Sequence, residues 1–154
     1  RYYVGELNGK SSKQAYMDAL HISESNIINQ TFHNPLGKMN GQDICIISLK
    51  EVSGNGLCCY RQVNDSDVLV LLEEQDYNEI LDETLQRIRR DFNHISGVFS
   101  INCVFRYLLF SQEHHMEDYL KTMSTLGEHA GLIGFGEHYN QQFVNQTMTC
   151  VVFE

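Results

Sequence analysis

The chain has 154 residues, which suits one domain, and its 42% hydrophobic and 20% charged residues are ordinary for a globular protein. Its formal charge of −9 and sequence pI near 5.1 argue against a nucleic-acid binder and against charge-driven attachment to anionic membranes, because both need a basic surface. No uninterrupted apolar run approaches the roughly 18 residues of a membrane helix, so we expect no membrane insertion. The sequence starts at Arg1 rather than Met, and we expect it to be a fragment of a longer chain.

The first half of the chain predicts a strand, two helices, a loop and three strands, in that order. Ser11 or Ser12 can cap the first helix and Ser23 the second, because a serine hydroxyl accepts a hydrogen bond from a free N–H group of the first turn. The Gly54-Asn55-Gly56 segment favours a hairpin, since these residues tolerate positive φ. The expected elements are a strand at 2–7, helices within 12–20 and 24–28, a loop at 33–37 that contains Pro35 and Gly37, and strands at 43–52, 56–63 and 67–73.

The second half predicts a long helix, a buried strand, another helix and two strands. Asp76 and Glu79 have capping-box spacing, and apolar residues follow at steps of three and four. The expected elements are a helix at 76–95, a strand at 97–104, a helix within 105–126, and strands at 131–135 and 143–153. The order β-αα-βββ-α-β-α-ββ predicts an α+β fold, with helices packed on a mixed, mostly antiparallel sheet, as a single domain over residues 1–154.

The cysteines are odd in number and lie in apolar runs with strand character. Free cysteine behaves as a small buried hydrophobe, and no pair has the spacing of zinc ligands. The pattern predicts reduced thiols without disulfides, a cytoplasmic location and no bound metal. The five residues are Cys45, Cys58, Cys59, Cys103 and Cys150.

Polar residues at the ends of apolar strands in the last third are the best candidates for a site, because packing does not require them there. Arg106 follows the buried strand at the start of a helix, where free N–H groups favour anions, and its guanidinium group matches a carboxylate. It could hold a ligand carboxylate or form a structural ion pair with an acid such as Glu137. Gly136 and Glu137 follow one strand and Asn145 opens the next, so Glu137 and Asn145 could meet a ligand ammonium group or only shape turns.

Two further groups have plain structural interpretations. His114 and Asp118 are one helical turn apart and could share a metal, but no second liganding element is evident, so we interpret them as a solvated helix face. Cys103 and a distant histidine could form a nucleophile pair, but nothing nearby would lower the pKa of the thiol. We therefore expect neither catalysis nor a cofactor.

Five short motifs occur along nearly the whole chain. They are Tyr3-x-x-Glu6-Leu7-Asn8-Gly9-Lys10 followed by Ala15-Tyr16, Asn34-Pro35-Leu36-Gly37, Asn102-Cys103-x-x-Arg106-x-Leu108, Gly131-x-x-x-Phe135-Gly136-Glu137, and Asn145-Gln146-Thr147. In this order they resemble the C-terminal FIST domain, a sensory module of signalling proteins. The chain departs from that family at Leu132, Gly134 and Phe135, where Phe, Thr and Tyr are common, and at Phe143, where the family has His. These changes make the implied site more apolar.

The resemblance implies a non-catalytic, small-ligand-binding sensory domain of a cytoplasmic signal-transduction protein, with amino acids as candidate ligands. It also implies an N-terminal FIST domain and a signalling output domain in the full chain. Two alternatives stay open: a protein–protein interaction module, as in the ubiquitin-ligase adaptors of a eukaryotic branch, and a Cys- or His-dependent enzyme. The implied ligand-binding residues are Asn102, Cys103, Arg106, Phe135, Gly136, Glu137 and Asn145.

Overall fold

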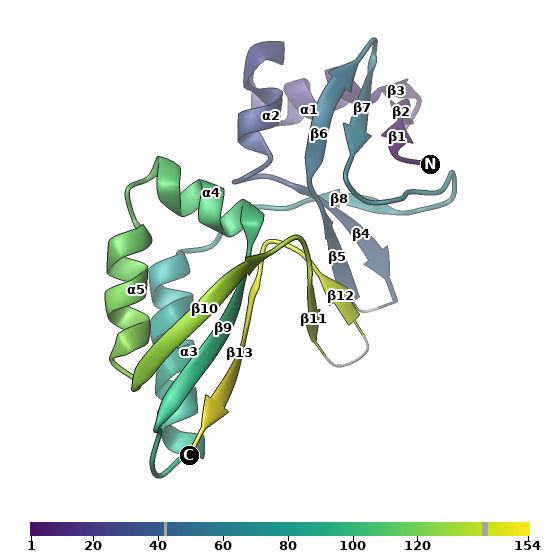
Figure 1. Cartoon of the computed structure of the whole chain (residues 1–154). Coiled ribbons are helices and arrows are strands. Elements are labelled where there is room, and N and C mark those ends of the chain that lie inside the picture. The colour runs from purple at the N-terminus through teal and green to yellow at the C-terminus, as the bar shows by residue number, and fades with distance from the viewer. Residues whose placement is uncertain (42, 140–141) are drawn as a thin grey trace. The chain divides into compact units, whose positions relative to one another are not determined.

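The structure is a computed structural model that describes residues 1–41, 43–139 and 142–154 (Figure 1). The chain divides into two compact units, Arg1–Glu74 and Gln75–Glu154. The described residues form helices and several mostly antiparallel sheets, which confirms the predicted α+β class. Among the same residues, no helix combines the length and the apolar character needed to cross a membrane.

In its described residues, the first unit combines three small antiparallel sheets with short helices. The sheets have strand orders β1-β7-β6, β2-β3 and β5-β4-β8. Helix α1 is capped as predicted, because the Ser11 side chain accepts a hydrogen bond from the Gln14 N–H group. The elements are β1 (Tyr3–Val4), β2 (Glu6–Leu7), β3 (Lys10–Ser11), α1 (Ser12–Leu20), the 3₁₀ helix η1 (Glu24–Asn26), α2 (Ile27–Gln30), β4 (Leu36–Asn40), β5 (Asp43–Ile47), β6 (Leu49–Ser53), β7 (Gly56–Cys59) and β8 (Leu69–Leu71).

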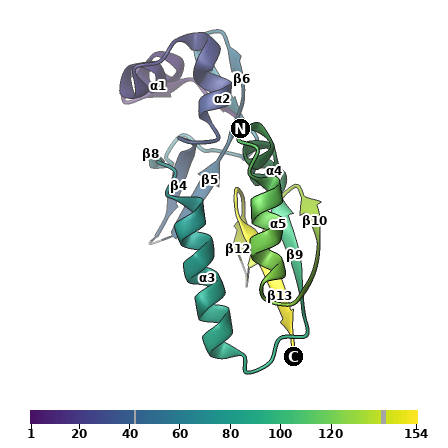
Figure 2. The same ribbon diagram turned by 90° about the vertical axis from the view of Figure 1, so that its left-hand side faces the viewer.

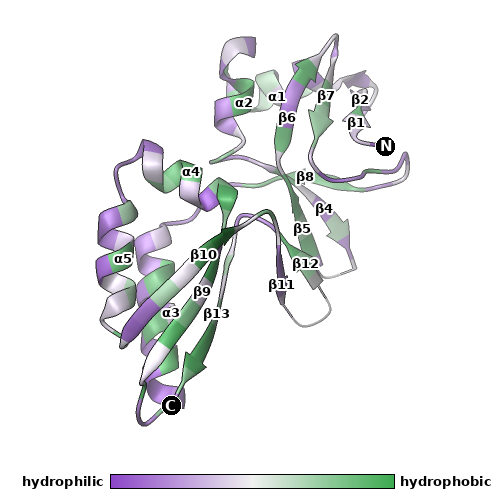
Figure 3. Ribbon diagram, in the orientation of Figure 1, coloured by the Kyte–Doolittle hydropathy of each residue, from purple (hydrophilic) through white to green (hydrophobic). Residues whose placement is uncertain are grey.

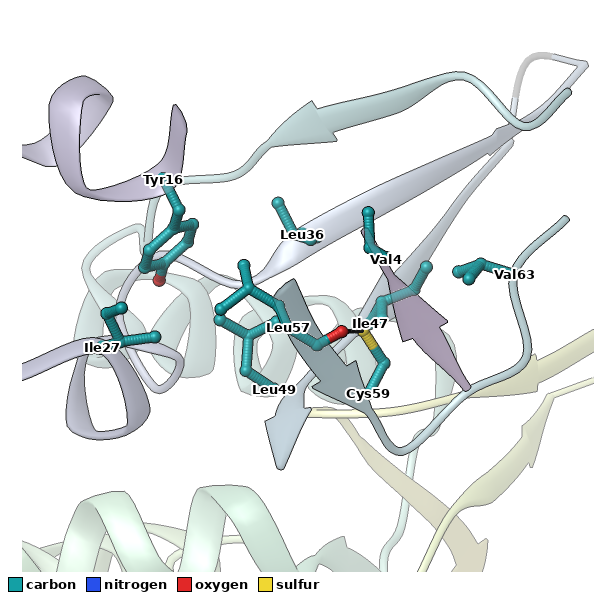
Figure 4. Close-up of a cluster of buried hydrophobic side chains, with 9 residues drawn as sticks. All are labelled: Val4, Tyr16, Ile27, Leu36, Ile47, Leu49, Leu57, Cys59 and Val63. Atoms are coloured by element: carbon teal, nitrogen blue, oxygen red, sulfur yellow. Dashed lines mark hydrogen bonds between the residues drawn. The ribbon is translucent and has the colours of Figure 1, made fainter. Parts of the chain in front are cut away.

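A cluster of buried hydrophobic side chains forms the core of the first unit (Figure 4). Tyr16 of α1 is 2% exposed and its hydroxyl donates to the Asn34 carbonyl at 2.7 Å. The Asn34 side chain donates to the Leu72 carbonyl at 3.0 Å, so these two bonds fix the segment that precedes β4. Burial also raises the pKa of Cys59 to about 11. The cluster contains Val4, Tyr16, Ile27, Leu36, Ile47, Leu49, Leu57, Cys59 and Val63.

The second unit is built on a three-stranded sheet of order β10-β9-β13, in which β9 is parallel to β10 and antiparallel to β13. Helices α4 and α5 pack on this sheet (Figures 1 and 2), and its strands are largely hydrophobic (Figure 3). Strands β11 and β12 pair with each other as a separate hairpin. The elements are α3 (Tyr77–Asp91), β9 (Gly97–Cys103), α4 (Val104–Gln112), α5 (Met116–Ser124), β10 (Glu128–Gly134), β11 (Glu137–Tyr139), β12 (Gln142–Val144) and β13 (Met148–Phe153).

Several expected elements are divided in the structure. The single helix expected within 105–126 is α4 and α5, because His114 adopts φ +56° and ends the helical path between them. The strand expected at 43–52 becomes β5 and β6, which separate at Ser48 and join different sheets. The strand expected at 143–153 becomes β12 and β13, with Gln146 at φ +55° between them. Strand β4 starts at Leu36, inside the expected loop.

Candidate functional site

The predicted site lies at the junction between β9 and α4. Strand β9 ends at Cys103 and α4 starts at Val104, so Asn102 and Cys103 end the central strand and Arg106 lies in the first helical turn. Asn102 and Cys103 are 2% and 1% exposed, although one carries an amide and the other a thiol. Where a buried polar strand end lies beside a helix N-terminus, backbone N–H groups and side chains can bind the same ligand.

Asn102 and Arg106 form one polar group at this junction. The Arg106 Nε atom donates to Asn102 Oδ1 at 3.0 Å, which the i,i+4 spacing across the strand–helix junction permits. The Arg106 guanidinium carbon lies 4.8 Å from the centroid of the Phe110 ring, in the range of a cation–π contact. Asn102 Nδ2 is buried and has no hydrogen-bond partner among the described residues. The amide nitrogen, which carries two N–H groups, is therefore an unused donor.

Glu137 and Thr147 form a second polar group. Glu137 opens β11, is 2% exposed, and accepts a hydrogen bond at Oε2 from Thr147 Oγ1 at 3.0 Å. The Cys103 thiol, a weak donor, and nearby backbone N–H groups also interact with this carboxyl group, but burial outweighs them and raises the pKa of Glu137. Oε1 accepts no well-formed hydrogen bond from the described residues. The carboxyl group therefore keeps one unused acceptor.

The Cys103 thiol lies at the N-cap position of α4. It makes no standard capping hydrogen bond, but the backbone N–H groups of Phe105 and Arg106 act on the sulfur and favour the thiolate. Burial and the neighbouring Glu137 charge oppose them, and burial is the largest influence, so the pKa of Cys103 is raised. The thiol is therefore protonated at neutral pH, which makes it a poor nucleophile.

The remaining predicted residues surround Glu137 in the sequence. The Phe135 side chain is 88% exposed in the bend between β10 and β11. Gly136 adopts φ +136°, and a side chain there would overlap the Phe143 ring, so the position requires glycine. Asn145 is half-buried in the turn that leads to β13. The structure thus brings Asn102 to Arg106 and Cys103 to Glu137, whereas the Phe135 side chain faces solvent.

Sequence reasoning missed Thr147 as a site residue. Its hydroxyl donates a hydrogen bond to Glu137, and its carbonyl accepts one from the Cys103 N–H group at 3.0 Å. Thr147 therefore connects Glu137 to the end of β9. The Asn145-Gln146-Thr147 motif already contained this residue. Its role depends on the pairing of β13 with β9, which the motif does not reveal.

A buried polar cluster beneath α5 was missed as well. Ser100 Oγ lies 2.9 Å from His129 Nε2, and burial lowers the pKa of His129. Ser100 is two residues before Asn102, so both side chains leave the same face of β9. The Tyr119 hydroxyl approaches the same serine. Ser100 and Asn102, two polar residues at alternate positions of an otherwise apolar strand, were the sequence pattern that could have indicated this cluster.

His114, Glu117 and Asp118 are exposed, whereas His115, the N-cap residue of α5, packs its ring against Tyr77 and Phe110. Lys121 lies 2.9 Å from Glu117 and 3.9 Å from Asp118, with all three side chains mostly exposed. Among the residues that the structure describes, no group of three or more His, Cys, Asp or Glu side chains could hold a metal ion.

A family model of the FIST C domain matches residues 13–140. This range contains the β9–α4 junction and Glu137, and it ends before Asn145 and Thr147. No match was found among curated proteins or among solved structures.

Proposed function

The chain belongs to the FIST C domain family, a family of sensory domains of signal-transduction proteins, and we propose that it senses a small ligand at the β9–α4 junction. The two units act as one non-catalytic sensory domain in a cytoplasmic protein. An N-terminal FIST domain and a signalling output domain in the full chain are its expected partners. The raised pKa of Cys103 gives no support to thiol catalysis.

The unused donor of Asn102 and the unused acceptor of Glu137 carry this proposal. Each belongs to a side chain that is 2% exposed. Leaving one buried polar group unsatisfied costs about 1–3 kcal/mol, and most such groups in native proteins are paired. A ligand that brings both an acceptor and a donor would satisfy the two atoms together.

An α-amino acid has this pair of groups. Its carboxylate would meet the Asn102 amide, the Arg106 guanidinium group and the positive end of α4, all of which favour an anion. Its ammonium group would meet Glu137, with Asn145 as a further acceptor. We therefore propose amino acids as the ligand class.

The experiment is a calorimetric screen of amino acids against this chain and against the full-length protein. Arg106→Lys should weaken binding by roughly 1.5–3 kcal/mol, because lysine cannot reproduce the planar pair of hydrogen bonds to a carboxylate. Arg87→Lys, on the exposed surface of α3, is the matched control and should leave the affinity unchanged. If no amino acid binds the wild type, the proposed ligand class is wrong. If Arg106→Lys unfolds the protein, Arg106 has a structural role.

A specific surface favours the protein-interaction module as the second candidate. Leu132 of β10 pairs with Ile101 of β9, and Val151 of β13 lies on the same face of the β10-β9-β13 sheet. The Leu132 and Val151 side chains are 49% and 57% exposed. Contiguous exposed apolar residues mark interaction sites. A partner of the full-length protein that is lost on Val151→Asp but retained on Arg106→Lys would support this candidate.

A further inference from the structure

The β11–β12 hairpin depends on contacts beyond its own pairing. Among the described residues its strands pair as Glu137↔Val144, His138↔Phe143 and Tyr139↔Gln142, and they form a two-stranded sheet separate from β10-β9-β13. An isolated two-stranded hairpin is marginally stable at best in water. The hairpin must therefore be held at places where its side chains reach the rest of the second unit.

Glu137 is the buried residue of β11, whereas His138 and Tyr139 are exposed. Its carboxyl group accepts a hydrogen bond from the Thr147 hydroxyl at 3.0 Å, and the Thr147 carbonyl accepts one from the Cys103 N–H group at 3.0 Å. These two bonds lead from the first residue of the hairpin to the end of β9. The contact lies at the base of the hairpin, so its loss would free both strands together.

The backbone on the other side of Glu137 is suited to a hinge. Gly136 adopts φ +136°, a conformation open to glycine, and it lies against the Phe143 ring of β12. Phe135 before it is 88% exposed and adds no buried anchor. Rotation at this bend would therefore move the hairpin with little loss of packing from the bend itself.

We propose that Glu137 is a releasable tether, so that the β11–β12 hairpin detaches from the second unit as one piece when the Glu137–Thr147 contact is lost. In the sensor proposed above, on which this last step rests, a ligand ammonium group that binds Glu137 at Oε1 draws the carboxyl group away from the Thr147 hydroxyl at Oε2. An ammonium–carboxylate contact carries charge on both partners, whereas the Thr147 hydroxyl is a neutral donor to the same carboxylate, so the exchange favours release. The hairpin then reports ligand occupancy to the rest of the protein.

Hydrogen exchange measured by mass spectrometry on the chain tests the tether without any ligand. Thr147→Val and Glu137→Ala should speed exchange of the β11 and β12 amides by about 10- to 100-fold, while β9, β10 and β13 keep their protection. Glu137→Gln retains an acceptor oxygen for Thr147 and should keep the hairpin protected. Thr149→Val makes the same substitution two residues further along the chain, in β13. It is the control and should match the wild type.

Three results would overturn the tether. The first is an unchanged rate of hairpin amide exchange in both Thr147→Val and Glu137→Ala. The second is an equal acceleration of amide exchange in β9 and β13, and the third is a hairpin whose amides are already unprotected in the wild type. If Thr147→Val does not give a cooperative thermal transition, the comparison of Glu137→Ala with Glu137→Gln decides alone. Because the measurement uses no amino acid, its result is independent of the calorimetric screen.

Discussion

The close approach of β10 to β9 predicts that Gly131→Ala destabilises the second unit. Gly131 pairs with Ser100, and a Cβ atom at Gly131 would lie 2.6 Å from Ser100 Oγ and 2.7 Å from the Ser100 carbonyl oxygen. The hydroxyl can rotate away, but the carbonyl belongs to the backbone, so the two strands must separate. Overpacking of this kind costs about 1–3 kcal/mol, and the backbone contact places Gly131→Ala in the upper half of that range.

Urea unfolding followed by circular dichroism measures this loss as a lower midpoint at an unchanged slope. In thermal unfolding, each kcal/mol corresponds to about 2–4 °C for a chain of this size. Gly134→Ala on the same strand is the matched control, because its Cβ would meet the movable Ile101 Cγ2 methyl at 3.1 Å. It should cost less. If Gly131→Ala is no less stable than Gly134→Ala, the close packing of Gly131 on Ser100 is refuted.

Three further predictions concern titration and thiols. Burial raises the pKa of Glu137 above 4.5, so the fold loses stability as the pH rises and this carboxyl group ionises. Glu137→Gln should therefore have a higher melting temperature than the wild type at about pH 7, and this difference should vanish below the ordinary pKa of glutamate. Burial lowers the pKa of His129 below 6.5, so the fold loses stability as the pH falls from 6.5 through the lowered pKa; melts of His129→Gln should show a smaller loss, and an equal loss would contradict this. Thiol titration of the denatured chain without reductant should find all five cysteines free, and a lower number would indicate a disulfide.

Local hydrogen bonding explains why two helix starts, capped by Ser11 and Asp76, and one hairpin were predictable from the sequence, whereas the Ser23 side chain makes no capping hydrogen bond. Asp76 accepts from the N–H groups of Asn78 and Glu79, as its capping spacing predicts. The Gly54-Asn55 turn joins β6 to β7 with Ser53 opposite Gly56. In each case the partners are within a few residues, so the sequence contains the whole interaction.

Strand partners were harder to predict because they are distant in sequence. Pro35 and Gly37 favoured a loop, yet Leu36 starts the central strand of a sheet and pairs with Ile47 and Leu71. Central position supplies two ladders of backbone hydrogen bonds, which outweigh the poor strand propensity of glycine. The separation of β5 from β6 has the same origin, since each strand has a different partner.

The site shows the same division between local and distant contacts. Asn102 and Arg106 are four residues apart, and their contact could be predicted from spacing, whereas Glu137 meets Thr147 only through the arrangement of β11 and β13. Consecutive residues of a strand project to opposite faces, so Asn102 and Cys103 direct the two polar groups to opposite sides of β9. A ligand that contacts both groups must therefore sit where the strand ends, because the sheet separates them elsewhere. That requirement favours a short molecule with an anionic and a cationic group attached to one carbon atom, as in the α-amino acids proposed above.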